Sequence, residues 1–278
     1  MGIKFTKMHG LGNDFMVIDG VNQKINLDKE HIAILSNRYT GIGFDQCLLI
    51  EPSTSPEVDF NYRIFNADGR EVGQCGNGAR CLALFAYHSG LSTKKTLTVA
   101  TKTTTMQLKI NPNESVTVNM GIPKLAPHEI PFQMSPQKIA YDLPLNDGQT
   151  VPIHTINVGN PHAVLIVNDL ATASVHALGQ EISLHPYFPE QSNVGFMQII
   201  NPGHINLRVY ERGCGETNAC GSGAVAAAAI GRLYHQLGER VIVSLLGGDL
   251  IIDWPDKNAA IHLTGPARFV YQGELSSA

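Results

Sequence analysis

An internal repeat is the feature that most constrains how this chain can fold. Two stretches align at one offset, since 208 − 63 and 220 − 75 both equal 145. The aligned residues are Arg63-Ile-Phe-Asn66, Glu71 and Cys75-Gly-Asn-Gly-Ala79 in the first half, and Arg208-Val-Tyr-Glu211, Glu216 and Cys220-Gly-Ser-Gly-Ala224 in the second. Asn13 and Asn160 form a further pair, 147 residues apart. The chain of 278 residues is therefore expected to contain two related domains.

Apolar periodicity predicts the same order of strands and helices in both halves. In the first half we expect helices over residues 28–37, capped by Asp28, and 79–88, ended by Gly90, with strands over residues 3–7, 15–18, 46–50, 60–65, 96–100, 104–110 and 115–120. In the second half we expect a helix within 169–178 and the residues that follow, and another over 223–237, ended by Gly238, with strands over 155–158, 159–166, 193–200, 205–210, 240–246, 249–254 and 259–263. The proline-bearing stretch 123–136 is expected to connect the halves. Strand-rich halves with few helices predict a mixed α/β (α+β) fold.

Composition excludes several classes of partner. The net charge is −4, the pI is about 6.2, and basic residues are scattered, so neither nucleic acid nor an anionic membrane is expected as a partner. No apolar run reaches the roughly 18 residues of a membrane span, and the N-terminus lacks the apolar core of a signal peptide. We therefore expect a cytoplasmic protein that binds a small polar molecule.

Two of the five cysteines stand at matching positions of the repeat. Cys75 and Cys220 each lie in a glycine-rich loop just before a predicted helix. The first amides of a helix lack intrahelical partners and the macrodipole is positive there, so this position favours a thiolate and can receive a bound carboxylate. The odd total predicts free thiols, not a disulfide framework.

Paired thiols predict proton transfer at a carbon centre. Duplicated domains usually face each other about an approximate twofold axis, which would place one thiol on each side of a ligand. One thiolate could then remove a proton from one face while the other thiol protonates the opposite face. A thiol pKa near 8.5 allows one cysteine to be ionised and the other not. Glu211 and His162 are the polar neighbours expected to bias that balance.

Six motifs resemble the diaminopimelate epimerase family, whose members interconvert LL- and meso-diaminopimelate in lysine and peptidoglycan precursor biosynthesis. They are HGLGNDF, GIGFDQ, NADG, QCGNGARC, GNPHAV and ERGCGETNACGSGA, and the resemblance runs from the first strand to the C-terminus. It implies two pseudo-symmetric domains, each a barrel-like, mostly antiparallel sheet around a central helix, with the active site in the cleft between them. The implied domains are 1–118 with 264–278, and 119–263. It also implies a homodimer and catalysis without pyridoxal phosphate, metal or any other cofactor.

The resemblance assigns roles residue by residue. Cys75 and Cys220 become the acid–base pair, His162 and Glu211 tune their pKa values, and Tyr271 becomes a dimer contact. The implied substrate contacts are Asn13, Gln46, Asn66, Gly76, Asn77, Asn160, Asn193, Glu211, Arg212, Gly221 and Ser222. Ser222 departs from the family, which usually has threonine there; a backbone contact survives that change and a methyl contact does not.

Other interpretations of these motifs remain open on the sequence alone. Cys75/Cys81 and Cys214/Cys220 are both C-x5-C pairs, although structural zinc prefers tighter spacing. Gly221-Ser-Gly223-Ala-Val-Ala226 fits the nucleotide-binding pattern G-x-G-x-x-A, but about ten residues separate it from the preceding strand.

Other roles for the cysteines, and other functions for the chain, also remain open. A disulfide between Cys75 and Cys220 would be an inactivating oxidation product. Cys47 and Cys81 are expected to be packing residues only. The rivals to an epimerase of diaminopimelate are a proline or hydroxyproline racemase and a zinc- or redox-regulated binding protein.

Overall fold

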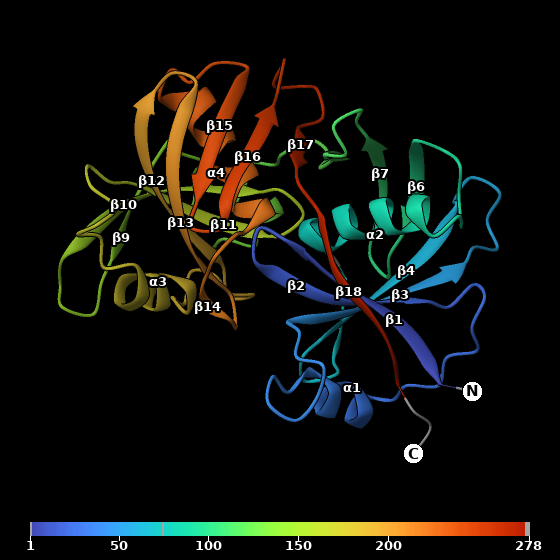
Figure 1. The fold of residues 1–278 in the computed structure, drawn as a ribbon. Coiled ribbons are helices and arrows are strands. Elements are labelled where there is room, and N and C mark those ends of the chain that lie inside the picture. Colours follow the sequence, from blue (N-terminus) through green and yellow to red (C-terminus); the bar gives the residue numbers. More distant parts are fainter. Residues whose placement is uncertain (1, 74, 276–278) are drawn as a thin grey trace. The chain divides into compact units, whose positions relative to one another are not determined.

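A computed structural model of the chain describes residues 2–73 and 75–275. The chain divides into two compact units (Figure 1). Unit 1 runs up to Val118 and includes the segment from Gly265 onward, and unit 2 is Asn119–Thr264. Each unit combines a large sheet with few helices, so the mixed α+β fold predicted from the sequence is confirmed. Among the described residues, no helix is long and apolar enough to cross a membrane.

Unit 1 is built on a mostly antiparallel sheet. Its elements are β1 (Ile3–Gly10), β2 (Asn13–Asp19), α1 (Lys29–Ser36), β3 (Gln46–Pro52), β4 (Phe60–Asn66), β5 (Glu71–Val72), α2 (Gly76–His88), β6 (Thr96–Ala100), β7 (Thr105–Ile110), β8 (Val116–Asn119) and β18 (Arg268–Leu275). The strands pair in the order β18-β1-β2-β3-β4-β6-β7-β8, with β5 also on β4. Of these pairs, β2–β3 and β4–β6 are parallel.

Unit 2 repeats this topology. Its elements are η1 (Pro127–Glu129), β9 (Tyr141–Pro144), β10 (Thr150–Asn157), β11 (Pro161–Ile166), α3 (Val175–Ser183), β12 (Asn193–Asn201), β13 (His204–Glu211), β14 (Gly215–Thr217), α4 (Gly221–Tyr234), β15 (Arg240–Leu245), β16 (Gly248–Asp253) and β17 (His262–Gly265). The order is β9-β10-β11-β12-β13-β15-β16-β17, with β14 on β13. Here β11–β12 and β13–β15 are parallel.

The strand register repeats along with the topology. Phe15 pairs with Gln46 in unit 1, and His162 pairs with Asn193 in unit 2. Both members of the pair are displaced by 147 residues, since 162 − 15 and 193 − 46 have the same value. Because a slip of one residue would turn every side chain to the other face of a strand, equal registers place equivalent side chains on equivalent faces.

Two buried helices form the centre of the units. α4 contacts the strands from β10 to β13 together with β15 and β16, and α2 contacts β1, β2, β3 and β7 (Figure 1). Ten residues of α4 are buried, all of them alanine, glycine, valine or isoleucine, so the helix is apolar on all sides over this length, as expected for a helix enclosed by its own sheet. The opposite faces of the sheets pack α1 and α3 through separate apolar clusters. Strands buried on both faces explain apolar runs such as Cys47-Leu-Leu-Ile50.

The first turn of each central helix has the same construction. Cys75 and Cys220 are N-cap residues with extended backbones, and each sulfur accepts a hydrogen bond from the amide of the third helical residue, Gly78 or Gly223. A side chain cannot be accommodated at that third residue. A Cβ on Gly78 would overlap the buried Tyr62 hydroxyl, and one on Gly223 would lie 2.9 Å from Val209 Cγ2. The glycine therefore lets the strand approach the turn that holds the cysteine.

Several element boundaries differ from the sequence-based prediction. α4 ends at Tyr234, before the expected end at Gly238, because Leu237 folds back over Gly231 and Gln236 takes the left-handed conformation (φ 60°). The helix expected within 169–178 and the residues that follow begins at Val175 and ends at Ser183. The stretch 123–136 belongs to unit 2 and contains η1. The caps at Asp28 and Gly90 are confirmed: Asp28 accepts from the His31 amide, and Gly90 has φ 75°.

Replacing Gly78 with alanine tests the close approach of strand and helix. We expect Gly78→Ala to lower the free energy of unfolding by about 1–3 kcal/mol, the usual range for overpacking a core. Tyr62→Phe removes the hydroxyl that blocks the new methyl group, and this hydroxyl has no hydrogen-bond partner among the described residues. Urea unfolding of Gly78→Ala, Tyr62→Phe and the double variant should show most of the loss restored in the double variant. Strict additivity of the two changes would contradict this account.

Candidate functional site

In unit 1 the predicted contact residues gather at one edge of the sheet. β2 begins at Asn13, β3 runs parallel to it and begins at Gln46, and β4 runs antiparallel and ends at Asn66. Gln46 Nε2 donates to Asn66 Oδ1 over 2.9 Å. The sequence placed these residues far apart, and the strand directions bring their side chains to the same edge.

The Cys75 turn joins this edge through Asn13. Asn77 Nδ2 donates to Asn13 Oδ1 at 3.2 Å, and Cys75 Sγ lies 3.9 Å from the same oxygen. The Gly78 amide donates to the sulfur at 3.3 Å. Cys75 is half-buried, whereas Asn77 is buried. A thiol, two amide side chains and the first helical amides therefore converge at one point of unit 1.

A network of ion pairs fixes the position of Asn13. The sequence alone assigned the residues of these ion pairs no role. Asn13 Nδ2 donates to Asp45 Oδ2 at 2.8 Å, and Arg38 bridges Asp45 to Asp14. Lys7 also pairs with Asp14, at 2.5 Å. Although burial opposes ionisation of Asp14, hydrogen bonds from Arg38 and Lys7 lower its pKa to about 2. Asp14 and Asp45 stand inside the motifs HGLGNDF and GIGFDQ, so the sequence contained the signal that would have identified them.

Unit 2 presents the equivalent edge with a different set of side chains. Asn160 precedes β11, Asn193 begins β12, and Glu211 ends β13. Asn160 Nδ2 donates to Ser222 Oγ at 3.4 Å, matching the Asn77–Asn13 contact of unit 1. Asn193 Oδ1 accepts from the backbone amide of Arg212 at 2.8 Å. Eight predicted residues of this half, Asn160, His162, Asn193, Glu211, Arg212, Cys220, Gly221 and Ser222, thus form one continuous group.

His162 lies beneath this group and is neutral at physiological pH. Its side chain is fully buried, and its Nε2 lies 3.0 Å from Asn160 Oδ1 and 3.4 Å from Asn193 Nδ2. Burial, with a smaller contribution from the Arg212 charge, lowers its pKa to about 3. Its Nδ1 has no hydrogen-bond partner among the described residues. His162 therefore orients Asn160 and Asn193, the two amides that flank the Cys220 turn.

The surroundings of Cys220 favour the thiol, although its helix-terminal position by itself favours the thiolate. Burial raises its pKa well above the ordinary value, and the Glu211 carboxylate raises it further by its charge and by accepting a hydrogen bond from the thiol. Hydrogen bonds from Ser222, whose Oγ lies 3.6 Å from the sulfur, and from the Gly223 amide act in the opposite direction. The two stabilising contacts at the helix start are thus outweighed. Thr217, which the sequence analysis did not single out, donates to Glu211 Oε1 at 2.5 Å and fixes this carboxylate.

The remaining predicted residues have varied surroundings. Arg212 donates through Nη1 to the carbonyl of Glu190 at 2.6 Å. Gly76 and Gly221 are the first residues of α2 and α4, so their amides lack intrahelical partners. Tyr271 lies on β18, is 45% exposed, and packs edge-on against Phe5. A dinucleotide-binding turn at Gly221 is contradicted, because the β13–β14 hairpin separates the loop from any parallel strand that leads directly into α4.

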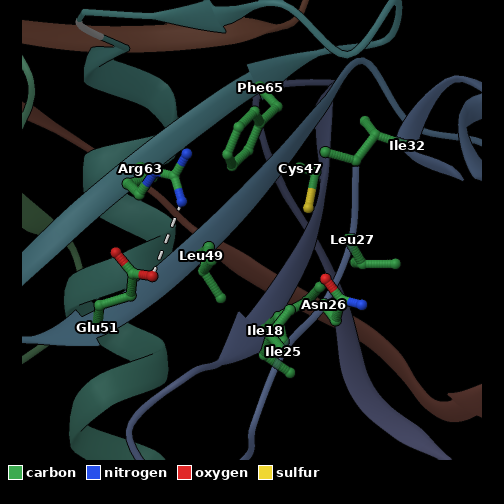
Figure 2. Close-up of a pocket in the computed structure, with 10 residues that line it drawn as sticks. All are labelled: Ile18, Ile25, Asn26, Leu27, Ile32, Cys47, Leu49, Glu51, Arg63 and Phe65. Atoms are coloured by element: carbon green, nitrogen blue, oxygen red, sulfur yellow. Dashed lines mark ion pairs between the residues drawn. The ribbon is translucent and has the colours of Figure 1, made fainter. Parts of the chain in front are cut away.

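A cavity of about 200 Å³ in unit 1 lies away from these groups (Figure 2). Its lining includes Cys47, Leu49 and Phe65 on the face that packs α1, and Arg63 and Glu51 stand at its polar side. Arg63 is already paired with Glu51 and, through two nitrogens, with Glu71. Burial raises the pKa of Cys47 to about 12. Cys47 and Cys81 are buried packing residues, as predicted.

Comparison with solved structures defines the fold class first. A hydroxyproline epimerase from Agrobacterium vitis superposes with a TM-score of 0.71 at 14% identity, over 99% of this chain and 92% of that chain. A predicted epimerase from Pseudomonas aeruginosa gives a TM-score of 0.69 at 15% identity, over 99% and 100% of the two chains. The chain therefore has the fold of the epimerase and racemase class.

Sequence comparison then defines the family. The family model described as diaminopimelate epimerase matches residues 5–126 and 154–270. A diaminopimelate epimerase from Legionella pneumophila is 68% identical over 277 residues, which cover 100% of both chains. One from Pseudomonas aeruginosa is 50% identical over 275 residues, 99% of each chain. This chain belongs to the diaminopimelate epimerase family.

Neutral burial of His162 predicts how stability depends on pH. Its pKa is lowered from 6.5 to about 3 on folding, so protons bind the unfolded state preferentially and stability falls as the pH drops below about 6.5. Between pH 7 and pH 5 this histidine should account for about 2 kcal/mol of the loss. Urea unfolding of His162→Gln should show a correspondingly smaller loss over that interval.

The exposed His128→Gln is the matched control for removing a histidine. Equal pH dependence in the wild type and in His162→Gln would show that the imidazole does not stay neutral on folding.

Proposed function

We propose that this chain is a cofactor-independent isomerase that interconverts LL- and meso-diaminopimelate, with Cys75 and Cys220 as its two acid–base residues. Membership of the diaminopimelate epimerase family supports the substrate. The observation that carries the mechanism is the repeated helix start. Two cysteines, 145 residues apart, each cap a buried helix, and each sulfur accepts a hydrogen bond from the amide of the third helical residue. No second function is favoured by a comparable observation.

The reaction transfers one proton off and one proton onto the same α-carbon. The thiolate of one cysteine removes the α-hydrogen and becomes a thiol, leaving the electron pair on the carbon and its carboxylate. The thiol of the other cysteine donates its proton to the opposite face and becomes a thiolate. The configuration at that carbon is inverted, and the next turnover in the same direction requires the two cysteines to exchange protonation states.

Stabilising the carbanion is the difficult part of this reaction. An α-hydrogen is a very weak acid, and negative charge develops on the carboxylate as the proton leaves the α-carbon. The amides of Gly76, Asn77, Gly221 and Ser222 in the first turns of the two helices are suited to receive this charge, because preorganised donors in a dry site are usually the largest catalytic contribution. Asn13, Asn160, Asn193 and Arg212 supply amide and guanidinium groups for the distant amino and carboxylate ends. Gln46, Asn66 and Glu211 complete the contact set at the strand ends.

Separate tasks for the two cysteines predict stereospecific defects. In deuterium oxide the wild type should introduce solvent deuterium at the α-carbon starting from either isomer, with no pyridoxal phosphate or metal added. Cys75→Ser and Cys220→Ser should each lose epimerisation by at least a hundredfold, the lower end of what general acid–base catalysis contributes. Each variant should keep measurable exchange from one isomer only, and the isomer should differ between the two variants.

Two comparisons sharpen this experiment. Cys214→Ser removes an exposed cysteine that is given no role here, and it should turn over at the wild-type rate. Proline serves as the comparison substrate and should not be turned over. Activity that persists in Cys75→Ser, or that returns only with pyridoxal phosphate, would exclude the two-thiol mechanism.

We also infer that the chain acts as a homodimer in the cytoplasm, where amino acid precursors are made. Phe269, Val270 and Tyr271 on β18 are 41, 55 and 45% exposed, so an edge of unit 1 carries three large apolar side chains in a row. Such a patch is typical of a surface that another subunit covers.

Charge placed in this patch should separate the subunits. We expect Tyr271→Glu to shift the sedimentation coefficient from that of a dimer to that of a monomer at micromolar concentration, because a carboxylate would be desolvated at the contact. Tyr39→Glu is the control, since Tyr39 is 97% exposed and lies outside the patch. A wild-type chain that sediments as a monomer would refute the dimer.

A further inference from the structure

Arg80 is a charged side chain that the proposed reaction leaves unexplained. It lies on α2, five residues after Cys75, and its side chain has no exposed surface. Burying an arginine without an ion-pair partner is costly, because the lost hydration is not replaced by an opposite charge. Among the described residues, no carboxylate lies within ion-pair distance of it, although thirteen other ion pairs are formed.

The contacts of Arg80 place its guanidinium behind the first turn of α2. Nε donates to the Pro266 carbonyl at 3.1 Å, and Nη1 lies 3.4 Å from the carbonyl oxygen of Gly76, the residue after Cys75. Nη2 is buried without a hydrogen-bond partner, and it lies 3.0 Å from the point where a side chain on Gly10 would begin. Two neutral acceptors thus hold a full positive charge beneath the turn that carries the thiol.

The repeat shows that this charge belongs to one half only. Position 80 + 145 in unit 2 is Val225, which is buried in α4 and uncharged. The opposite difference occurs at the strand end, where Asn66 of unit 1 corresponds to Glu211 of unit 2. Helix α2 therefore carries a buried cation that α4 lacks, and β13 ends in a carboxylate that β4 lacks.

On the unit 1 elements that pack against α2, the other charged side chains that the structure describes are paired or face solvent. Lys7 of β1 and Arg38 are matched by Asp14 of β2 and Asp45. Tyr62 of β4 is neutral, because burial raises its pKa well above its ordinary value, and burial likewise raises the pKa of the Cys81 thiol. At the start of β3 the side chain is the neutral Gln46, and β7 turns Lys109 into solvent. Of the described groups, the two that act electrostatically on Arg80 are the neighbouring cysteines, Cys81 and Cys75.

We propose that Arg80 is a positioning residue that stabilises the Cys75 thiolate, so that the resting chain has a thiolate at Cys75 and a thiol at Cys220. In a poorly hydrated interior, a fixed positive charge strongly favours the ionised form of a nearby thiol. The unequal charges of the two halves would then set which isomer the resting chain accepts first. The inference rests on the proposed acid–base role of Cys75, but Arg80 itself needs no contact with substrate.

Thiol titration tests this proposal without substrate. The rate of alkylation by iodoacetamide is followed against pH at Cys75 and Cys220 in the same sample by mass spectrometry. Arg80→Gln keeps a donor for the Pro266 carbonyl and Arg80→Met removes it, while both remove the charge. We expect both variants to raise the midpoint of Cys75 by about one pH unit, a tenfold loss of thiolate below the midpoint, and to leave Cys220 unchanged.

Matched controls separate charge from packing. Arg63→Gln removes a paired arginine from the same unit and should not move the Cys75 midpoint. The buried thiols Cys47 and Cys81 report folding, since they are alkylated slowly only in a folded chain. If these thiols react rapidly in one Arg80 variant, that variant is unfolded and is set aside. The Cys75 midpoint of the other Arg80 variant then decides the test. A Cys75 midpoint that stays at the wild-type value in a folded variant would overturn the proposal, as would a shift confined to Arg80→Met when both variants fold. Epimerisation at the wild-type rate in a variant whose Cys75 midpoint has risen as expected would instead count against the proposed function alone.

Discussion

The hydrogen bond from a helix amide to a cysteine sulfur is the interaction on which the arrangement of each unit depends. It fixes Cys75 and Cys220 as N-caps, and it requires glycine at the third helical position, because a strand presses against the same turn. The first two amides of each helix lie at the same terminus, beside the capped amide. A thiol and two donors are therefore presented together wherever this turn occurs, and the repeat makes it occur twice.

The edge of each sheet supplies the amide side chains that surround the cysteine-bearing turn. Parallel pairing of β2 with β3, and of β11 with β12, brings the starts of two strands to one edge, while the antiparallel neighbour brings its end there. Amide side chains at those ends meet the cysteine turn through Asn13 in unit 1 and Asn160 in unit 2. Most of the remaining scaffold serves to enclose α2 and α4, so that these short-range contacts are held in a rigid core.

Equivalent backbones carry unequal charges. Glu211 raises the pKa of Cys220, and its counterpart Asn66 has no charge. Arg80 and its counterpart Val225 differ in the opposite sense. Different charges beside two thiols separate their pKa values. The repeat thus reproduces the backbone geometry, and a few side-chain differences make the surroundings of the two cysteines unequal.

The sequence by itself determined the repeat, the mixed α+β class, the helices capped by Asp28 and closed by Gly90, and the cysteine-bearing helix starts, because each rests on local periodicity or local backbone preference. It did not reveal β18, whose first five residues are all exposed and so show no apolar alternation, nor the early end of α4, which Leu237 imposes by packing on Gly231. Only the tertiary structure decided that burial and Glu211 favour the thiol form of Cys220, that burial favours neutral His162, and that Arg80 is buried with no carboxylate of the described residues within ion-pair distance. Each of these depends on how much water and which charges surround a group, and residues distant in sequence determine both.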